Sequence, residues 1–157
     1  MELDPQLMKD IRLAEAHGGI PNLVAYKDIN GFWTIGFGHK FPDQTEDYTG
    51  TSITADRAES LLETDVSGAA LECAQLPEWP HLETPCRQNA VIELVFNMGV
   101  GDTQHGWRSF AHTRLALIGQ DWQGAHDQLL ASSWHREVGD IRAIRLANYL
   151  LMGEYPS

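Results

Sequence analysis

The stretch Tyr26–His39, YKDINGFWTIGFGH, constrains the fold of this chain more than any other segment. It contains Asn30-Gly31, the dipeptide that most strongly favours a short hairpin turn, followed by four residues of high β propensity at 32–35. A hairpin this short buries little surface and is marginally stable alone. It carries three polar side chains near its turn: Asp28, Thr34 and His39. We therefore interpret it as the support of a functional site, although Asp28 taken alone could be an ordinary turn residue.

Composition narrows the class of protein. A chain of 157 residues with 43% hydrophobic residues fits one compact unit, or two lobes that share a core. The net charge of −11 argues against nucleic acid as a partner, and it opposes long-range attraction to an anionic polymer such as bacterial cell wall. Cys73 and Cys86 fit two reduced thiols. The histidines show no metal-binding spacing, so we predict no metal and no cofactor.

The sequence also bears on location. No apolar run approaches the roughly 20 residues that a membrane helix needs, so we predict no membrane insertion. The first residues, MELDPQLMKD, are acidic and polar, unlike a signal peptide. We expect synthesis in the cytoplasm, and any work outside it then needs another protein for release or delivery.

Asp4-Pro5 predicts the start of the first helix, as N-cap and first helical residue. Apolar residues then recur at helical spacing: Leu7, Met8, Ile11 and Ala14. Glu15 falls on or beside this buried face, where a carboxylate is unusual, and Gly18-Gly19 ends the helix. Two interpretations are open. Glu15 is either a salt-bridged structural residue or a general acid whose protonated form is favoured by the apolar setting.

The next helix follows a loop. Residues 40–52 are polar and contain Pro and Gly, and Thr54 then caps the long helix ITADRAESLLETDVSGAALECAQL. Its apolar face is formed by Ala58, Leu61, Leu62, Val66 and Ala69. Asp65 falls inside that stripe, so it requires a partner where it is buried.

The remainder of the chain is predicted to be helical. Thr84-Pro85 starts the helix CRQNAVIELVFNMG, which is apolar nearly all round and is therefore expected to be the central buried helix. Its polar residues form one stripe: Asn89, Glu93 and Asn97. This stripe fits either a cleft wall or an interhelix hydrogen-bond network. SFAHTRLALIG and DWQGAHDQLLASSW are two further amphipathic helices, and Asp140 caps IRAIRLANYLLMG.

The hairpin register decides which side chains share a face. In a two-residue turn over Asn30-Gly31, Asp28 lies opposite Trp33, and Thr34 points to the other face because side chains alternate along a strand. Asp28 and Thr34 can act together only if the turn absorbs an extra residue. We therefore predict a longer loop or a bulge at residues 29–33, with Asp28 opposite Thr34.

The string Y-x-D-x-x-G-x-x-T-I-G-x-G-H resembles the signature of phage endolysins of the T-even lysozyme type, glycoside hydrolase family 24. IRLAE at 11–15 resembles the family segment that ends in the catalytic Glu, and ITADRAESLLETD, NAVIELVFNMG and SSWHREVGDIRAIR also look like family segments in the same order. The resemblance covers nearly the whole chain. One departure is that ten residues separate Glu15 from Tyr26, about four more than the resemblance implies. The surplus, somewhere in HGGIPNLVA, is expected to form a loop that brings Glu15 back to the hairpin.

The resemblance implies an α+β fold that is mainly α and lysozyme-like, in a single domain over residues 1–157. A small β-hairpin lobe at 15–54 is joined by a connecting helix at 55–74 to a larger helical lobe, formed by residues 1–14 and 75–157. His39 and Asp65 are expected to form a structural ion pair between hairpin and helix.

The implied activity is hydrolysis of the β-1,4 bond between N-acetylmuramic acid and N-acetylglucosamine in peptidoglycan. Glu15 is the general acid, and Asp28 with Thr34 positions water, with carboxylates roughly 6.5–9.5 Å apart and inversion at the anomeric carbon. Arg142 matches a family arginine near the acid. Residues matched or expected at the glycan site are Lys40, Phe96, Asn97, Thr113 and Gln128. We expect a monomer that is released from the host cytoplasm by a holin or other delivery protein and acts in the periplasm.

Three alternatives share much of this sequence pattern. A lytic transglycosylase uses one acid and no water, and the presence of Asp28 with Thr34 argues against it. A binding module that has lost catalysis is compatible with the longer loop after Glu15. A toxin delivered to a rival's cell wall would use the same chemistry, and no residue here separates it from a lysis enzyme.

Overall fold

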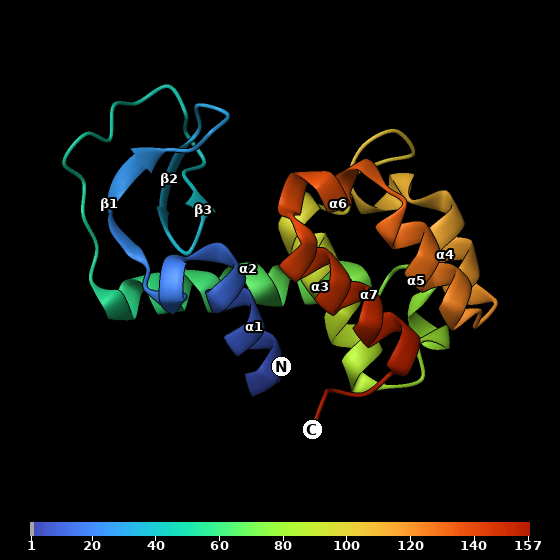
Figure 1. Cartoon of the computed structure of the whole chain (residues 1–157). Coiled ribbons are helices and arrows are strands. Elements are labelled where there is room, and N and C mark those ends of the chain that lie inside the picture. Colours follow the sequence, from blue (N-terminus) through green and yellow to red (C-terminus); the bar gives the residue numbers. More distant parts are fainter. Residues whose placement is uncertain (1) are drawn as a thin grey trace. The chain divides into compact units, whose positions relative to one another are not determined.

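The computed structural model describes residues 2–157 and has the predicted α+β architecture, mainly helical with one small antiparallel sheet (Figure 1). Contacts divide the chain into two units, one ending at Gly68 and the other running from Ala69 to Ser157. The lobe boundaries expected from the sequence stay a prediction. Within the described residues, no helix is both long and apolar enough to cross a membrane.

Helix α1 (Pro5–Glu15) begins where the sequence predicts. A side-chain oxygen of Asp4 accepts a hydrogen bond of 2.8 Å from the backbone N–H of Gln6, which caps the helix. The buried side chains are Leu7, Met8, Asp10 and Ile11. The prediction that Ala14 belongs to the buried face is wrong. Ala14 is exposed, because the helix ends at Glu15 and no further turn extends the stripe. The short helix η1 (His17–Gly19) follows.

The sheet contains three antiparallel strands in the order β1 (Asn22–Lys27), β2 (Trp33–Gly36) and β3 (His39–Lys40). Strand β3 is an addition to the predicted hairpin, too short to give a pattern of its own. The connection after it returns along the outer edge of β1, where the backbone N–H of Ala25 donates to the carbonyl of Thr51 over 2.8 Å. This edge is therefore covered by the chain itself.

The hairpin loop is longer than two residues, as predicted, but the predicted pairing is wrong. Tyr26, not Asp28, lies opposite Thr34, and the backbone N–H of Asp28 donates to the carbonyl of Phe32 over 2.9 Å. Three residues, 29–31, therefore form the loop. Since alternate residues of a strand face the same side, Tyr26 and Asp28 lie on the same face as Thr34. Asp28 and Thr34 therefore share one face of the hairpin, as predicted, although the pairing register differs from the predicted one.

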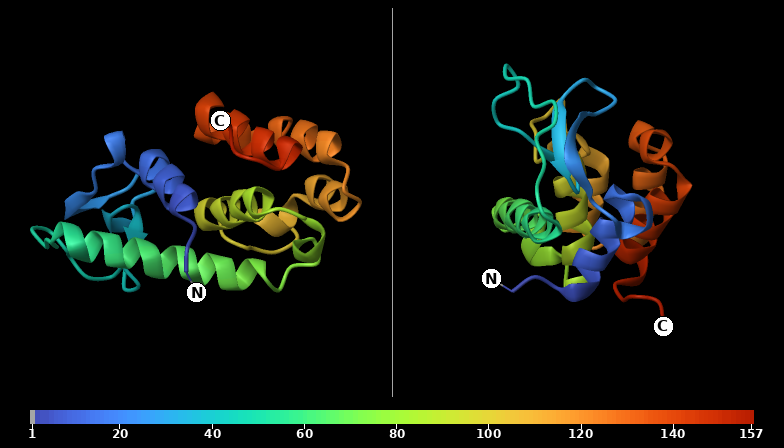
Figure 2. Two further views of the ribbon diagram at one scale, coloured as in Figure 1. Left: turned by 90° about the horizontal axis from the view of Figure 1, so that it is seen from below. Right: turned by 90° about the vertical axis from the view of Figure 1, so that its left-hand side faces the viewer.

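Helix α2 (Ala55–Cys73) carries the sheet on its N-terminal half (Figures 1 and 2). A Cβ atom placed on Gly36 would lie 3.4 Å from the Cβ atom of Ala58, so β2 packs directly on the helix. Four residues of the predicted stripe are buried, Ala58, Leu62, Val66 and Ala69, and Ala70 and Cys73 are buried beside them. Leu61 is half-buried.

The second unit is built around α3 (Pro85–Met98), which starts as predicted because the Thr84 hydroxyl caps the N–H of Arg87. The short helices η2 (Trp79–His81) and η3 (Trp107–Ser109) flank α3 along the chain. Four helices follow: α4 (Ala111–Ile118), α5 (Trp122–Leu130), α6 (Ser133–Val138) and α7 (Asp140–Met152). Figure 1 shows α4 beside α5 and α5 beside α7, and these helices contact one another.

Two predicted helix boundaries in this unit are wrong. The segment expected to form one helix over 121–134 stops at Leu130, where the Ser132 hydroxyl donates to the carbonyl of Leu129 over 2.6 Å and competes with the helical pattern. A separate helix, α6, then begins. Asp140 is the first residue of α7 and not its cap, because its carboxylate bonds to the His135 ring instead, over 2.7 Å.

Candidate functional site

Asp28 is fixed by the turn that it closes. Its Oδ1 atom accepts hydrogen bonds of 2.9 Å from the backbone N–H groups of Asn30 and Phe32. Among the described residues, no hydrogen bond is made to its Oδ2 atom. The side chain is half-buried. One oxygen of Asp28 therefore holds the loop in shape, and the other is left for a ligand or water.

Thr34 lies on the same face of the hairpin, 3% exposed. Its hydroxyl donates a hydrogen bond of 2.8 Å to the carbonyl of Phe32. With its only proton engaged, the Thr34 oxygen can interact with a further group only as an acceptor. Lys40 pairs with Thr34 across β2 and β3, so it belongs to the same face, and its ammonium group lies 4.7 Å from the centroid of the Phe32 ring.

Glu15 is the last residue of α1 and is half-buried, with its Oε1 atom enclosed by protein. Gly38 leaves room for it, since a Cβ atom at that position would lie 3.2 Å from Oε2 of Glu15. Gly38 also has a φ angle of 86°, a conformation that favours glycine. The turn between β2 and β3 thus passes close to the carboxylate.

Tyr26 links the two carboxylates electrostatically. Burial raises the pKa of its phenol, and the charges of Glu15 and Asp28 raise it further. Tyr26 was not among the predicted site residues, although it lies two residues before Asp28 and therefore on the same face of the strand.

The expected pair of His39 and Asp65 is confirmed. The Nδ1 atom of His39 lies 2.8 Å from Oδ2 of Asp65, with side chains 23% and 34% exposed. The contact ties β3 to α2. It therefore supports the turn containing Gly38 that faces Glu15.

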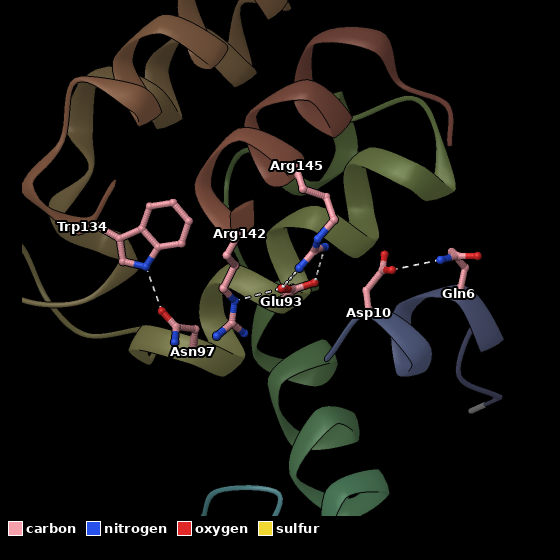
Figure 3. Close-up of polar contacts among 7 residues, drawn as sticks. All are labelled: Gln6, Asp10, Glu93, Asn97, Trp134, Arg142 and Arg145. Atoms are coloured by element: carbon pink, nitrogen blue, oxygen red, sulfur yellow. Dashed lines mark hydrogen bonds and ion pairs between the residues drawn. The ribbon is translucent and has the colours of Figure 1, made fainter. Parts of the chain in front are cut away.

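In the second unit, Glu93 is 1% exposed and is held by two arginines of α7 (Figure 3). Arg142 donates through Nε to Oε2 over 3.0 Å, and Arg145 donates to both carboxylate oxygens over 2.9 and 2.7 Å. Figure 3 also shows the indole N–H of Trp134, which donates to Oδ1 of Asn97 over 2.8 Å.

The polar stripe of α3 is completed by Asn89, whose amide donates to the Tyr155 hydroxyl over 2.6 Å. The sequence left two interpretations of this stripe open, a cleft wall and an interhelix hydrogen-bond network. The structure contains the hydrogen-bond network. Asn97 and Arg142 are part of this network. Their predicted roles toward a glycan stay predictions.

Two other predicted residues meet in one pocket of the second unit. Thr113 and Gln128 line a pocket of about 280 Å³, together with Phe110, His112 and the Ser132-Ser133 pair. Phe96 is half-buried near the end of α3 and is not in this lining. No pattern in the sequence pointed to Ser132-Ser133, because these residues reach the pocket only through the break between α5 and α6.

The predicted site residues therefore form two groups. Glu15, Asp28, Thr34 and Lys40 belong to the first unit, and the others to the second. Among the residues that the structure describes, no group of three or more His, Cys, Asp or Glu side chains is arranged to hold a metal ion.

Comparison with known proteins identifies the family. The sequence profile described as "Phage lysozyme" matches residues 16–146, a span that includes Asp28, Thr34 and Arg142 and begins one residue after Glu15. The "Pre-baseplate central spike protein Gp5" of Enterobacteria phage T4 is 27% identical over an alignment that covers 86% of this chain and 26% of that protein. The chain thus spans about a quarter of the length of this relative. Since the family match extends over most of the sequence, this chain belongs to the phage lysozyme family.

Proposed function

We propose that this protein is a lysozyme that cleaves the β-1,4 bond between N-acetylmuramic acid and N-acetylglucosamine in peptidoglycan. Family membership supports peptidoglycan hydrolysis in general. The specific bond and the catalytic residues are our proposal. The observation that carries it is geometric: Asp28 and Thr34 share one face of the hairpin, and the turn at Gly38 that follows β2 passes beside the Glu15 carboxylate.

Glu15 acts as the general acid and protonates the leaving glycosidic oxygen. It is the last residue of α1, and the enclosure of its Oε1 atom by protein shields that oxygen from bulk water. Glu93 is a weaker candidate, because both of its oxygens already bind arginine side chains.

Asp28 and Thr34 position the attacking water. Because the Thr34 hydroxyl donates to Phe32, its oxygen accepts one water proton, and Oδ2 of Asp28 accepts the other. The lone pair of the water is then directed at the anomeric carbon. As the new C–O bond forms and the glycosidic bond breaks, one water proton passes to Asp28 and the proton of Glu15 stays on the leaving sugar. Inversion follows if the two carboxylates are roughly 6.5–9.5 Å apart.

The glycan strand contacts Lys40 on the hairpin face and the pocket of Thr113 and Gln128 in the second unit. Phe96, Asn97 and Arg142 are proposed as further contacts. The protein works as a monomer, on the wall in the periplasm, after release from the host cytoplasm by a holin or another delivery protein. A second route to the wall is attachment to a phage tail, because the relative is a pre-baseplate central spike protein.

Mass spectrometry of the muropeptides released from purified peptidoglycan tests bond and mechanism together. The wild type is expected to give reducing N-acetylmuramic acid ends that carry one ¹⁸O atom when the digestion is run in H₂¹⁸O. Glu15→Gln is expected to lower the rate by about 10²–10⁴-fold, as for loss of a general acid, whereas Glu137→Gln, at an exposed position of α6, leaves it unchanged.

The other outcomes discriminate between the alternatives. Anhydro-muramic ends without ¹⁸O identify a lytic transglycosylase. Binding without any released muropeptide identifies an inactive module. A Glu15→Gln variant that digests the wall at the rate of the wild type means that the acid is another residue.

A further inference from the structure

A polar pocket lies on the face of the hairpin opposite Asp28 and Thr34. Its volume is about 520 Å³. Two of its lining residues, Lys27 and Trp33, are cross-strand partners, and they alternate with the residues of the catalytic face. The loop after β3 supplies the other wall, which includes Glu46, Asp47 and Thr49. The proposed mechanism uses none of these side chains.

Trp33 is the single apolar side chain in this lining. Its ring is half-buried, and the edge contact with Tyr48, with ring centroids 5.9 Å apart at an angle of 75°, fixes its orientation. Tyr48 in turn stacks on Phe41. The ammonium group of Lys27 lies 5.3 Å from the centroid of the Trp33 ring. The pocket thus offers one held aromatic ring with a cation over its face.

The loop wall is ordered before any ligand arrives. The side chain of Gln44 bonds to both backbone groups of Trp33, over 2.6 and 3.1 Å, and to the carbonyl of Phe41 over 2.7 Å. Asp47 accepts hydrogen bonds from the N–H and hydroxyl of Thr49. These bonds hold the pKa of the Asp47 carboxyl below its usual range, and Lys27 contributes to the same direction. A wall that is already fixed loses little entropy when it binds a ligand.

The chemistry of the lining selects the class of ligand. One lysine and two carboxylates, Glu46 and Asp47, leave the pocket with an excess of negative charge in a chain of net charge −11, which disfavours anions. A lipid or an apolar peptide would find a single apolar surface, whereas such ligands need mostly apolar walls. A neutral sugar suits the pocket, since its C–H face packs on an aromatic ring and its hydroxyl and acetamido groups bond to charged side chains.

We propose that this pocket is an accessory binding site for a neutral N-acetylated hexosamine of a glycan strand, separate from the catalytic face. The identity of the polymer as cell-wall glycan rests on the proposed function. A second weak contact to the same polymer raises the overall affinity without any new contact at the catalytic centre. It also offsets the repulsion expected between this acidic chain and an anionic wall.

The direct test is a ¹⁵N NMR titration of the Glu15→Gln protein with the tetramer of N-acetylglucosamine, following the indole N–H of Trp33. We expect this resonance to shift with its own dissociation constant. The double variant Lys27→Ala/Glu46→Ala is expected to raise that constant about tenfold, the factor that corresponds to the loss of one or two hydrogen bonds. Lys9→Ala/Glu137→Ala, which removes the same two residue types at exposed positions elsewhere, leaves it unchanged.

Two outcomes of the titration overturn the proposal, and one further variant serves if the double variant does not fold. If the amides of Tyr26 and Thr34 shift with the tetramer and the Trp33 indole does not, there is no accessory sugar site, and the proposed function is unaffected. If the indole shifts only with a wall stem peptide, the ligand class is wrong. If the double variant unfolds, as judged by its amide spectrum, Glu46→Ala alone provides the comparison.

Kinetics on the wild-type background separate this site from catalysis. With insoluble peptidoglycan as substrate, Lys27→Ala/Glu46→Ala is expected to raise KM about tenfold through lost avidity and to leave kcat unchanged. A fall in kcat with an unchanged KM contradicts the proposal. If the wild type does not hydrolyse the wall, the proposed function fails, and the titration still reports on the sugar site.

Discussion

The Nε atom of Arg142 donates to Oε2 of Glu93 over 3.0 Å, in a site where the Glu93 side chain is 1% exposed. Arg145 donates to both carboxylate oxygens of Glu93. This arrangement joins α3 to α7 through a buried carboxylate and two arginines that are 10% and 22% exposed. Forming such an ion pair adds little to the free energy of unfolding, because both partners lose hydration. Removing one partner is costly, because it leaves a buried charge without compensation.

Glu93→Gln is therefore expected to destabilise the protein by about 3 kcal/mol, within the range for loss of one partner of a buried ion pair. Urea unfolding followed by circular dichroism measures this. Glu15→Gln provides the comparison, with an expected change below about 1 kcal/mol and a large loss of activity. A Glu93→Gln variant that is as stable as the wild type would show that the two arginines do not depend on this carboxylate.

Asp28 has separable structural and chemical roles, because Oδ1 binds two backbone N–H groups and Oδ2 does not. Asp28→Asn retains an oxygen acceptor for the loop but removes the negative charge. We expect it to lose about 10²-fold or more in hydrolysis and little stability. Asp28→Ala removes the acceptor as well and is expected to destabilise the fold by about 1–2 kcal/mol. Equal thermal midpoints for the two variants would show that Oδ1 does not hold the loop.

The role of the Thr34 hydroxyl is tested by two substitutions of similar size. Thr34→Ser keeps the hydroxyl and is expected to retain hydrolysis within about tenfold of the wild type, whereas Thr34→Val removes the water acceptor and is expected to lose about 10²-fold. The effect of valine on stability is small, about 1 kcal/mol, because the carbonyl of Phe32 still accepts from the N–H of Asp28. If valine and serine are equally active, Thr34 does not position the water.

The features that sequence reasoning predicted correctly are local ones. Asp4-Pro5 and Thr84-Pro85 mark helix starts within three residues of the bonds that they make, so a pattern can identify them. His39 was predicted as the partner of Asp65 from the family resemblance. Burial of a carboxylate indicates that it needs a partner but does not identify that partner.

Longer-range features were not predictable in this way. Asn30-Gly31 favours a two-residue turn, yet the Asp28 side chain captures two N–H groups and sets a three-residue loop. The partners of Glu93 lie 49 and 52 residues away. The pocket beside Trp33 exists because Gln44, eleven residues on, holds the loop against the strand, and no periodicity encodes such a contact.

The coupling between His39 and Asp65 can be measured with His39→Asn, Asp65→Asn and the double variant at one fixed pH. The pair is partly exposed, so we expect a coupling free energy of about 1 kcal/mol or less. Hydrolysis is expected to fall in each single variant, because the pair supports the turn beside Glu15. Free energies of unfolding that add in the double variant would mean that the two side chains do not stabilise each other.

We expect His135 to make the stability of the protein depend on pH. Its Nδ1 atom lies 2.8 Å from the carbonyl oxygen of Leu130, and its Nε2 atom lies 2.7 Å from Oδ1 of Asp140. Both partners are acceptors, so the ring satisfies both only as the doubly protonated cation. The Leu130 carbonyl first, and then the Asp140 carboxylate, raise the pKa of His135 above its ordinary value, against smaller opposing effects of burial and of Arg136.

A pKa that is raised on folding gives a stabilisation that is complete below the pKa of the unfolded chain, about 6.5. It is lost as the pH rises through the higher folded value. The difference in Tm between wild type and His135→Asn is therefore expected to be largest near pH 5.5 and to shrink above neutrality. His81→Asn, in η2, is the control for loss of a histidine and should show no such trend. A Tm difference that is constant with pH, or that grows toward alkaline pH, would exclude the cationic bridge between the end of α5 and the start of α7.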